Sequence, residues 1–203
     1  MGPGYLTRHL SPRACSHICK NTQDRIEMAE FPPSSLQPLA QEVVELLKTT
    51  RETVSVAETA AGGLISACLL SVPGASAVYK GGLTVYTLES RLAFAGWTQA
   101  DREKYRGPTT EIVGQMADRT RRTLESTYAV SESGTAGPTG GTTRNRTPGY
   151  VAMAVSTPNG NQTREVETGS SDRAQNMVAF ARESLQLLKE VISQSVTPAL
   201  QYS

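Results

Sequence analysis

The chain has 203 residues, of which 38% are hydrophobic and 19% charged, and its formal net charge at pH 7 is +1. These values are typical of one globular domain, and a charge so close to neutral gives no sign of a nucleic-acid or membrane partner recognised through bulk charge. No apolar run approaches the roughly 18 residues that a membrane span requires. Three cysteines are too few for a disulfide framework, so we expect a reducing, cytoplasmic compartment.

Residues 1–34 read as a disordered leader or extension. Four basic residues stand there, the first acidic residue is Asp24, and no apolar segment for secretion is present. This pattern weakly resembles a mitochondrial transit peptide, which makes a mitochondrial location the alternative to a cytoplasmic one. The other interpretation is that Met28 is the true start and that the preceding residues never fold.

Both histidines of the chain, His9 and His17, lie in this leader. The remainder therefore has no imidazole, which excludes a Ser-His-Asp triad, a Cys-His pair and a His-rich zinc site there unless the leader folds back. With Cys15 and Cys19 the two histidines offer a zinc alternative, which we disfavour because the segment has no periodic pattern of a folded scaffold. We therefore expect neither a metal nor a cofactor.

Hydrophobic periodicity divides the rest into alternating helices and strands, forming one domain over residues 35–195 and a tail over 196–203. In chain order the pattern predicts a helix from Leu36, a strand at 53–57, a helix after Gly63, a strand at 83–86, a helix at 110–124, strands at 128–133, 150–155 and 161–167, and a last helix after Asp172. Strands alternating with helices predict an α/β fold, a three-layer α/β/α sandwich with a mixed sheet.

Three loops rich in glycine carry the candidate chemistry, and each is expected to follow a strand and to converge with the others at one pocket. The first loop covers residues 57–63, where Gly62 and Gly63 open a helix whose free N–H groups attract anions; its alternative is a tight turn without a ligand. The second covers residues 73–76 and leads to Tyr86. The third covers residues 131–141 and continues to Arg144 and Arg146, a composition suited to a lid or an anion cradle.

Together these loops resemble the C-terminal domain of the CinA (competence/damage-inducible) family, the nicotinamide-nucleotide amidohydrolase fold. The resemblance covers about residues 36–192. It rests on Ala57-Glu58-x-x-x-Gly62-Gly63, Pro73-Gly74-x-Ser76, Gly82-x-x-x-Tyr86 and Ser133-Gly134-x-Ala136-Gly137-Pro138-x-Gly140-Gly141.

The resemblance implies hydrolysis of the carboxamide of nicotinamide mononucleotide to nicotinic acid mononucleotide and ammonia, by a serine nucleophile and a lysine base. It places the nucleophile at Ser76 and the conserved tyrosine of the site at Tyr86. It also places Ser133 in the site and Arg173 there as a phosphate partner. Together with residues of the glycine-rich loops, the expected ligand-binding set is Thr59, Gly62, Gly63, Ser133, Gly134, Gly137, Arg146 and Arg173.

Arg91 stands where the family has its lysine. A guanidinium stays protonated at physiological pH, so Arg91 is able to bind an anion but not to act as a general base. Three hypotheses follow: an amidohydrolase in which Lys80 or Tyr86 replaces the base, a protein that binds a phosphorylated nucleotide or metabolite without turnover, and an oligomer-forming partner whose pocket is vestigial. We expect a pyridine nucleotide as ligand and a homo-oligomer as assembly.

Overall fold

A mixed sheet of five strands forms the middle layer of the computed structural model, which describes residues 31–196 and the side chains of residues 31–195. Its strands are β1 (Val54–Glu58), β2 (Tyr79–Thr84), β3 (Tyr128–Gly134), β4 (Tyr150–Thr157) and β5 (Gly160–Glu167), in the order β2-β1-β3-β4-β5. The first three strands run parallel, whereas β4 is antiparallel to β3 and β5 is antiparallel to β4. Residues 1–30 of the leader and residues 197–203 of the tail lie outside the described residues.

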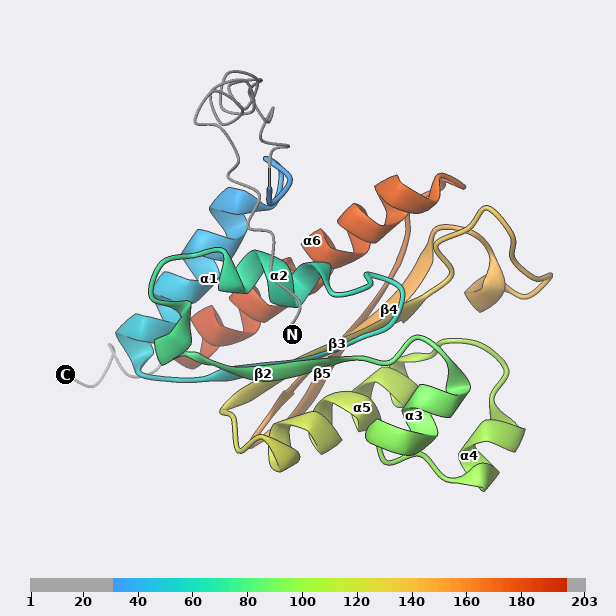
Figure 1. Ribbon diagram of the computed structural model, residues 1–203, viewed down its shortest axis with the longest axis horizontal. Helices are drawn as coiled ribbons and strands as arrows, with labels where there is room; N and C mark the ends of the chain where they lie inside the picture. The colour runs from blue at the N-terminus through green and yellow to red at the C-terminus, as the bar shows by residue number, and fades with distance from the viewer. Residues whose placement is uncertain (1–30, 197–203) are drawn as a thin grey trace, which may run out of the picture. The chain divides into compact units, whose positions relative to one another are not determined.

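Helices cover both faces of the sheet (Figure 1). One face carries α1 (Gln37–Thr50), α2 (Leu64–Leu70) and α6 (Arg173–Val196), and the other carries α3 (Leu88–Phe94), α4 (Gln99–Lys104) and α5 (Thr110–Thr123). Two 3-10 turns lie at Ala75–Ala77 and Arg144–Arg146. The predicted three-layer α/β/α sandwich with a mixed sheet is therefore confirmed.

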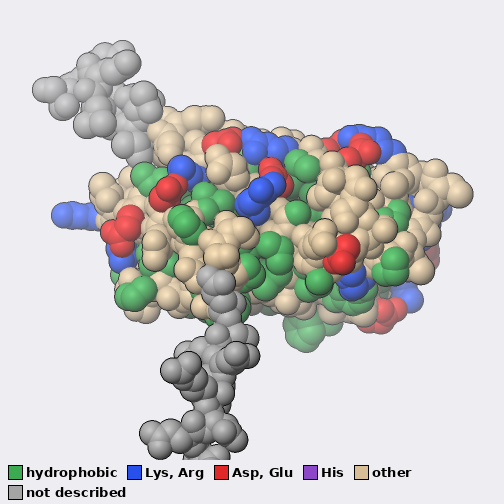
Figure 2. Space-filling model, turned by 90° about the horizontal axis from the view of Figure 1, so that it is seen from above, with side chains coloured by type: hydrophobic (Ala, Val, Ile, Leu, Met, Phe, Trp, Pro, Cys, Tyr) green, Lys and Arg blue, Asp and Glu red, His purple; other side chains and the backbone are tan. Residues whose placement is uncertain are grey.

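The larger part of the core lies between the sheet and the α1, α2 and α6 layer. It is built from apolar side chains at alternate strand positions and along the inner stripes of the helices, among them Val56, Val130, Met153, Leu47 and Phe180. Outside this core, Figure 2 shows the same layer from above, with acidic, basic and apolar side chains interspersed. The ion pairs there, such as Lys189 with Glu42, are partly exposed and each contributes little to stability.

The second strand differs from its prediction: it runs over Tyr79–Thr84, not over residues 83–86. Gly81 and Gly82 read as loop residues, yet both pair with β1. A β-carbon on Gly82 would lie 2.5 Å from the Tyr79 hydroxyl and 3.2 Å from the carbonyl oxygen of Val56. Close packing inside the sheet therefore accounts for this glycine. Tyr86 consequently lies beyond the strand.

This packing makes Gly82→Ala a destabilising change, because an overpacked site forces its neighbours to move. We expect a loss of about 1–3 kcal/mol in the free energy of unfolding, measured by urea denaturation. Tyr79→Phe/Gly82→Ala, which removes the nearest colliding oxygen, should recover part of that loss. Equal stability of the single variant and the wild type would contradict the packing argument.

Candidate functional site

Polar residues gather where β1 and β3 end side by side. The chain leaves β1 for β2 on one side and enters β3 on the other, and ligands of open α/β sheets bind at such a switch point, beyond the carboxyl ends of the strands. Thr59 follows β1 and Ser133 lies near the end of β3, and both are buried. The Thr59 hydroxyl donates a hydrogen bond to Ser133 Oγ over 3.2 Å.

Arg91, on α3, reaches this point with only 4% of its surface exposed. Its Nη2 donates to Ser133 Oγ at 3.3 Å and its Nε to the Val85 carbonyl at 3.4 Å. The guanidinium carbon lies 5.1 Å from the ring centre of Trp97 and 5.2 Å from that of Tyr105. Within the described part of the chain, no carboxylate forms an ion pair with it. Two aromatic faces thus hold a buried cation that forms no ion pair.

Two hydrogen-bond donors remain unused at this cation. Arg91 Nη1 is buried and has no partner among the described residues. Ser133 Oγ accepts both of its bonds, from Arg91 and from Thr59, so its own hydrogen is not engaged in either. A buried donor without a partner costs free energy, and an acceptor from a ligand would remove that cost.

Glu58 and Glu132 hold the turn between β1 and α2. Glu58 Oε2 accepts from the N–H groups of Gly63 and Ile65, and its Oε1 from the N–H and hydroxyl of Ser66, all within 2.7–3.0 Å. The expectation that Gly62 and Gly63 present free N–H groups to an anion is therefore wrong in its central point. A carboxylate of the chain itself already occupies the start of α2.

Glu132, on β3, is fully buried and receives the N–H groups of Thr59 and Ala61 on Oε1, at 2.6 and 2.9 Å. Its Oε2 has no partner among residues 31–195. Burial raises the pKa of this carboxyl to about 7, a shift that Glu58 increases and that the two N–H donors and Arg91 oppose. The turn carrying Thr59 is thus held by a group that titrates near neutral pH.

A second cluster lies at the same end of the sheet. Arg173, the first residue of α6, donates from Nη2 to the Tyr86 hydroxyl at 3.1 Å and from Nη1 to the Gly137 carbonyl at 3.0 Å. Tyr86 is 60% exposed, and the Arg173 guanidinium also lies 5.8 Å from its ring centre. Because Tyr86 follows Val85 and Gly137 lies four residues after Ser133, both clusters belong to one edge of the sheet.

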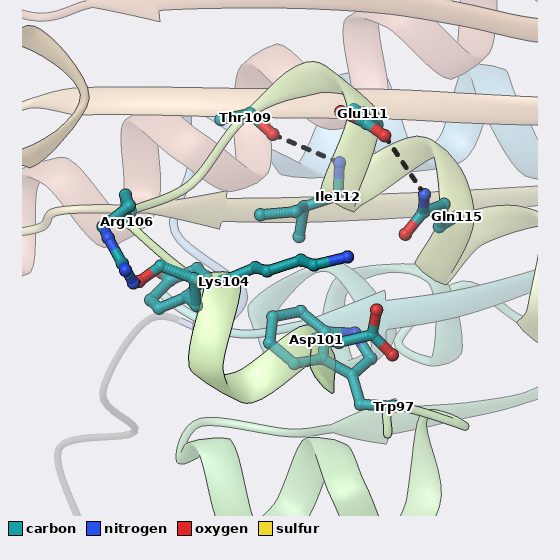
Figure 3. Close-up of a pocket in the computed structure, with 10 residues that line it drawn as sticks. Trp97, Asp101, Lys104, Arg106, Thr109, Glu111, Ile112 and Gln115 are labelled. Carbon is teal, nitrogen blue, oxygen red and sulfur yellow. Dashed lines mark hydrogen bonds between the residues drawn. The ribbon is translucent and has the colours of Figure 1, made fainter. Parts of the chain in front are cut away.

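Two cavities are lined by Tyr105, whose ring covers Arg91, although Arg91 itself lines neither of them. The larger, of about 440 Å³, lies between α4 and α5 and is lined by Trp97 together with charged side chains such as Asp101 and Glu111. In Figure 3, the Lys104 side chain extends through it between Ile112 and the Trp97 ring. The smaller, of about 290 Å³, is lined by residues of the third loop, namely Gly134, Thr135, Thr139, Gly140, Gly141 and Arg146.

Comparison of the sequence and the fold with known proteins shows the family of the chain. A family model described as the CinA C-terminal domain matches residues 36–192. The chain belongs to the CinA C-terminal domain family. A CinA-like protein of Desulfosudis oleivorans is 32% identical over 180 residues, which cover 89% of this chain and 42% of that relative. A CinA-like protein of Fervidobacterium nodosum is 38% identical over 118 residues, 58% of this chain and 29% of the relative. The chain thus spans less than half the length of these curated relatives.

Solved structures of this family share the fold. The crystal structure of the competence/damage inducible protein CihA from Agrobacterium tumefaciens superposes with a TM-score of 0.74 at 27% identity, covering 82% of this chain and 99% of that one. A CinA superfamily protein from Klebsiella pneumoniae gives a TM-score of 0.73 at 19% identity. None of the helices described for our CinA-family chain is both long and apolar enough to cross a bilayer.

Ser76 does not join the other site residues predicted for this CinA domain. It is exposed, and it lies in the turn between α2 and β2, which precedes a strand instead of following one. Lys48 at the end of α1 holds this turn through the Pro73 carbonyl. Tyr79 and Tyr128 are level in the sheet, since both pair with Val54. Ser133 lies five residues further along β3, about 17 Å at roughly 3.3 Å per residue.

The expectation that Ser76 lines one pocket with Tyr86, Ser133 and Arg173 is therefore wrong within a single chain. Lys80 lies near the start of β2 and is remote from Ser133 for the same reason. The other predicted residues lie at the carboxyl edge, although the Gly63 N–H there donates to the Glu58 carboxylate.

Sequence reasoning missed Trp97, Tyr105 and the structural role of Glu132. Two helix signals could have located the aromatic pair: the capping boxes that begin at Thr87 and Thr98 open α3 and α4, the helices that place Arg91 and end beside Tyr105. Among residues 31–195, no three His, Cys, Asp or Glu side chains are arranged to hold a metal ion.

Proposed function

We propose that this CinA-family chain binds a phosphorylated pyridine nucleotide at the carboxyl edge of its sheet and hydrolyses it slowly, if at all. The observation that carries the proposal is Arg91: a buried cation without a counter-ion, with a free donor and two aromatic rings beside it. Trp97 and Tyr105 offer stacking surfaces for a heteroaromatic ring. Arg146 and Arg173 lie at the surface of the same edge and supply charge for a phosphate.

Slow turnover follows from the chemistry of the groups present. A serine nucleophile needs a base to take its proton, and Ser133 instead accepts hydrogen bonds from a guanidinium and from a hydroxyl. Glu132 is fully buried, with Oε1 committed to Thr59 and Ala61. Ser133 is therefore better suited to donate a hydrogen bond to a ligand than to attack one.

The phosphate contacts are tested by calorimetric titration with nicotinamide mononucleotide. Arg173→Gln and Arg146→Gln should each weaken binding of the mononucleotide by about tenfold, roughly 1.4 kcal/mol, because a charge-assisted hydrogen bond is lost. Binding of the corresponding nucleoside, which has no phosphate, should change little. No detectable binding of the mononucleotide to the wild type would overturn the proposed function.

The second candidate is the amidase itself, with Ser76 supplied by another copy of the chain. The exposure of Ser76 at the far end of the sheet favours this candidate, because that position suits a residue that serves a neighbour. Ser76 Oγ would attack the amide carbon, the C–N bond would break with ammonia leaving as it gains a proton, and water would then release the carboxylate.

Subunit mixing separates these two candidates. If Ser76 acts across an interface, mixing inactive Ser76→Ala with inactive Arg91→Ala should restore ammonia release, since some mixed assemblies contain one intact site. If the chain only binds, neither the wild type nor the mixture should release ammonia above the rate without protein. Full turnover by Ser76→Ala alone would refute the nucleophile.

A further inference from the structure

We infer that Arg91 and Ser133 form a carboxylate subsite, so that this chain recognises the acid form of its aromatic ligand in preference to the amide. This inference rests on the proposed function for the nucleotide part of the ligand, and it names the group that the buried end of the site takes. The juxtaposition that carries it is an uncompensated guanidinium, a hydroxyl with an unused hydrogen and two aromatic rings.

The pattern of donors and acceptors sets the polarity of the group that fits. Arg91 Nη1 is a donor and has no acceptor, and the Ser133 hydroxyl already accepts two bonds and has only its hydrogen left. Both groups can therefore form a further hydrogen bond only with an acceptor. A carboxylate has two acceptor oxygens, whereas a carboxamide presents an NH₂ group that finds only donors at this point.

The charge of Arg91 also favours the acid form of the ligand over the amide. Arg91 is 96% covered by the protein, since 4% of its surface is exposed, and in the described chain it forms no ion pair. Glu132 affects Arg91 electrostatically but lies on the strand position facing α2, with its Oε1 bound to Thr59 and Ala61. A buried cation without a paired charge is costly, and an incoming carboxylate would supply that charge and a charge-assisted hydrogen bond.

The shape of the subsite favours a carboxylate over a phosphate. Trp97 and Tyr105 lie at 5.1 and 5.2 Å from the guanidinium carbon, with their ring planes inclined at 58° to one another. This setting suits a planar group conjugated to a flat ring. A phosphate has more charge and is tetrahedral, so burying it against one guanidinium would leave charge unpaired.

Ligand entry requires Tyr105 to move. With Gly107, it lines both the 440 Å³ and the 290 Å³ cavity, and the Arg91 guanidinium lies against its ring. Tyr105 ends α4, a six-residue helix with no buried residue, so few contacts oppose a rotation of this side chain. The two cavities would then join, with the guanidinium at their base.

The test compares four probes on the folded protein by calorimetric titration: nicotinate mononucleotide, nicotinamide mononucleotide, free nicotinate and free nicotinamide. For the wild type we expect the acid of each pair to bind at least about tenfold more tightly than its amide. Arg91→Gln should reduce this ratio to about twofold or less, and Ser133→Ala should reduce it partially. Arg173→Gln, the matched control, should weaken both mononucleotides equally and leave the ratio unchanged.

Each outcome has a distinct meaning. Equal or tighter binding of the amides by the wild type would overturn the inference without any variant, even if Arg91→Gln failed to fold. Binding of both mononucleotides with no preference would leave the proposed function standing and reject the carboxylate subsite. Selective binding of free nicotinate with no gain from the phosphate would support the subsite and reject the nucleotide. Competition of inorganic phosphate with free nicotinate would show that Arg91 takes phosphate instead, which also overturns the inference.

Discussion

Glu58→Ala should unfold the protein or bring it close to unfolding. The carboxylate of Glu58 is fully buried and accepts four hydrogen bonds, three from N–H groups at the start of α2 and one from the Ser66 hydroxyl. Alanine would leave all four donors without this acceptor: the Ile65 N–H is buried and the other three are partly buried, and a buried donor without a partner costs about 1–3 kcal/mol. Together with the cavity left by the fully buried side chain, we expect a loss of about 3–4 kcal/mol, a large part of the 5–15 kcal/mol by which small domains are stable.

The measurement is urea denaturation followed by circular dichroism, with Glu45→Ala as the matched control. Glu45 forms an exposed ion pair with Lys48 at 2.8 Å, so its loss should change the free energy of unfolding by less than about 1 kcal/mol. Glu58→Gln should fall between the two, because an amide keeps one acceptor oxygen but turns an NH₂ group towards N–H donors. Wild-type stability of Glu58→Ala would show that α2 does not depend on this carboxylate.

Glu132→Gln should remove a pH dependence that the wild type shows between about pH 4.5 and pH 7. Burial raises the pKa of Glu132 from its ordinary value of 4.5 to about 7. Its neutral form is thus the one that suits the folded state, and the stability it contributes is fully present below about pH 4.5. That contribution is lost as the pH rises through 7, by an amount on the order of 3 kcal/mol.

Glutamine resembles the neutral carboxyl, because its oxygen still accepts from the N–H groups of Thr59 and Ala61. Glu132→Gln should therefore match the wild type near pH 5 and exceed it at pH 8 in urea denaturation. Glu45→Gln should retain the pH profile of the wild type. A wild type that gains stability between pH 5 and pH 8, with Glu132→Gln following the same curve, would show that Glu132 is ionised in the fold throughout.

Hydrophobic periodicity in the sequence was sufficient to predict most of the helices and strands. It predicted none of the close packing between them. The continuous apolar run of β4 and helical stripes such as that of α1 predicted the layers correctly, because burial on both faces of a central strand and on one face of a helix dictates these patterns. The start of β2 was misplaced because Gly82 reads as a loop residue, whereas close packing against Tyr79, Ser66 and Val56 inside the sheet requires it. Ser66 and Val56 are distant from Gly82 in sequence, and no local pattern contains contacts with them.

The same limit applies to the site. The sequence motifs predicted that Ser133, Tyr86 and Arg173 lie at the same edge of the sheet. This could be predicted because the positions of strand ends and of the loops that follow them depend on the topology. The turn of Ser76 follows α2 and precedes β2, so it lies at the opposite end of the sheet from loops that follow strands; the glycine-rich composition that these loops share does not reveal this difference. The aromatic partners of Arg91, Trp97 and Tyr105, flank α4, a short helix that only its capping box signals in the sequence.

The last helix completes both the core and the ligand site, and this has a consequence for synthesis on the ribosome. α6 packs against α1, α2, β3 and β4, and its first residue, Arg173, joins Tyr86 to Gly137. Until the final third of α6 has left the exit tunnel, the apolar stripe of α1 and the inner face of β3 and β4 have no partner to cover them. The nascent chain must therefore present these surfaces to chaperones or to solvent until α6 has emerged, and this layer of the core cannot be completed before then.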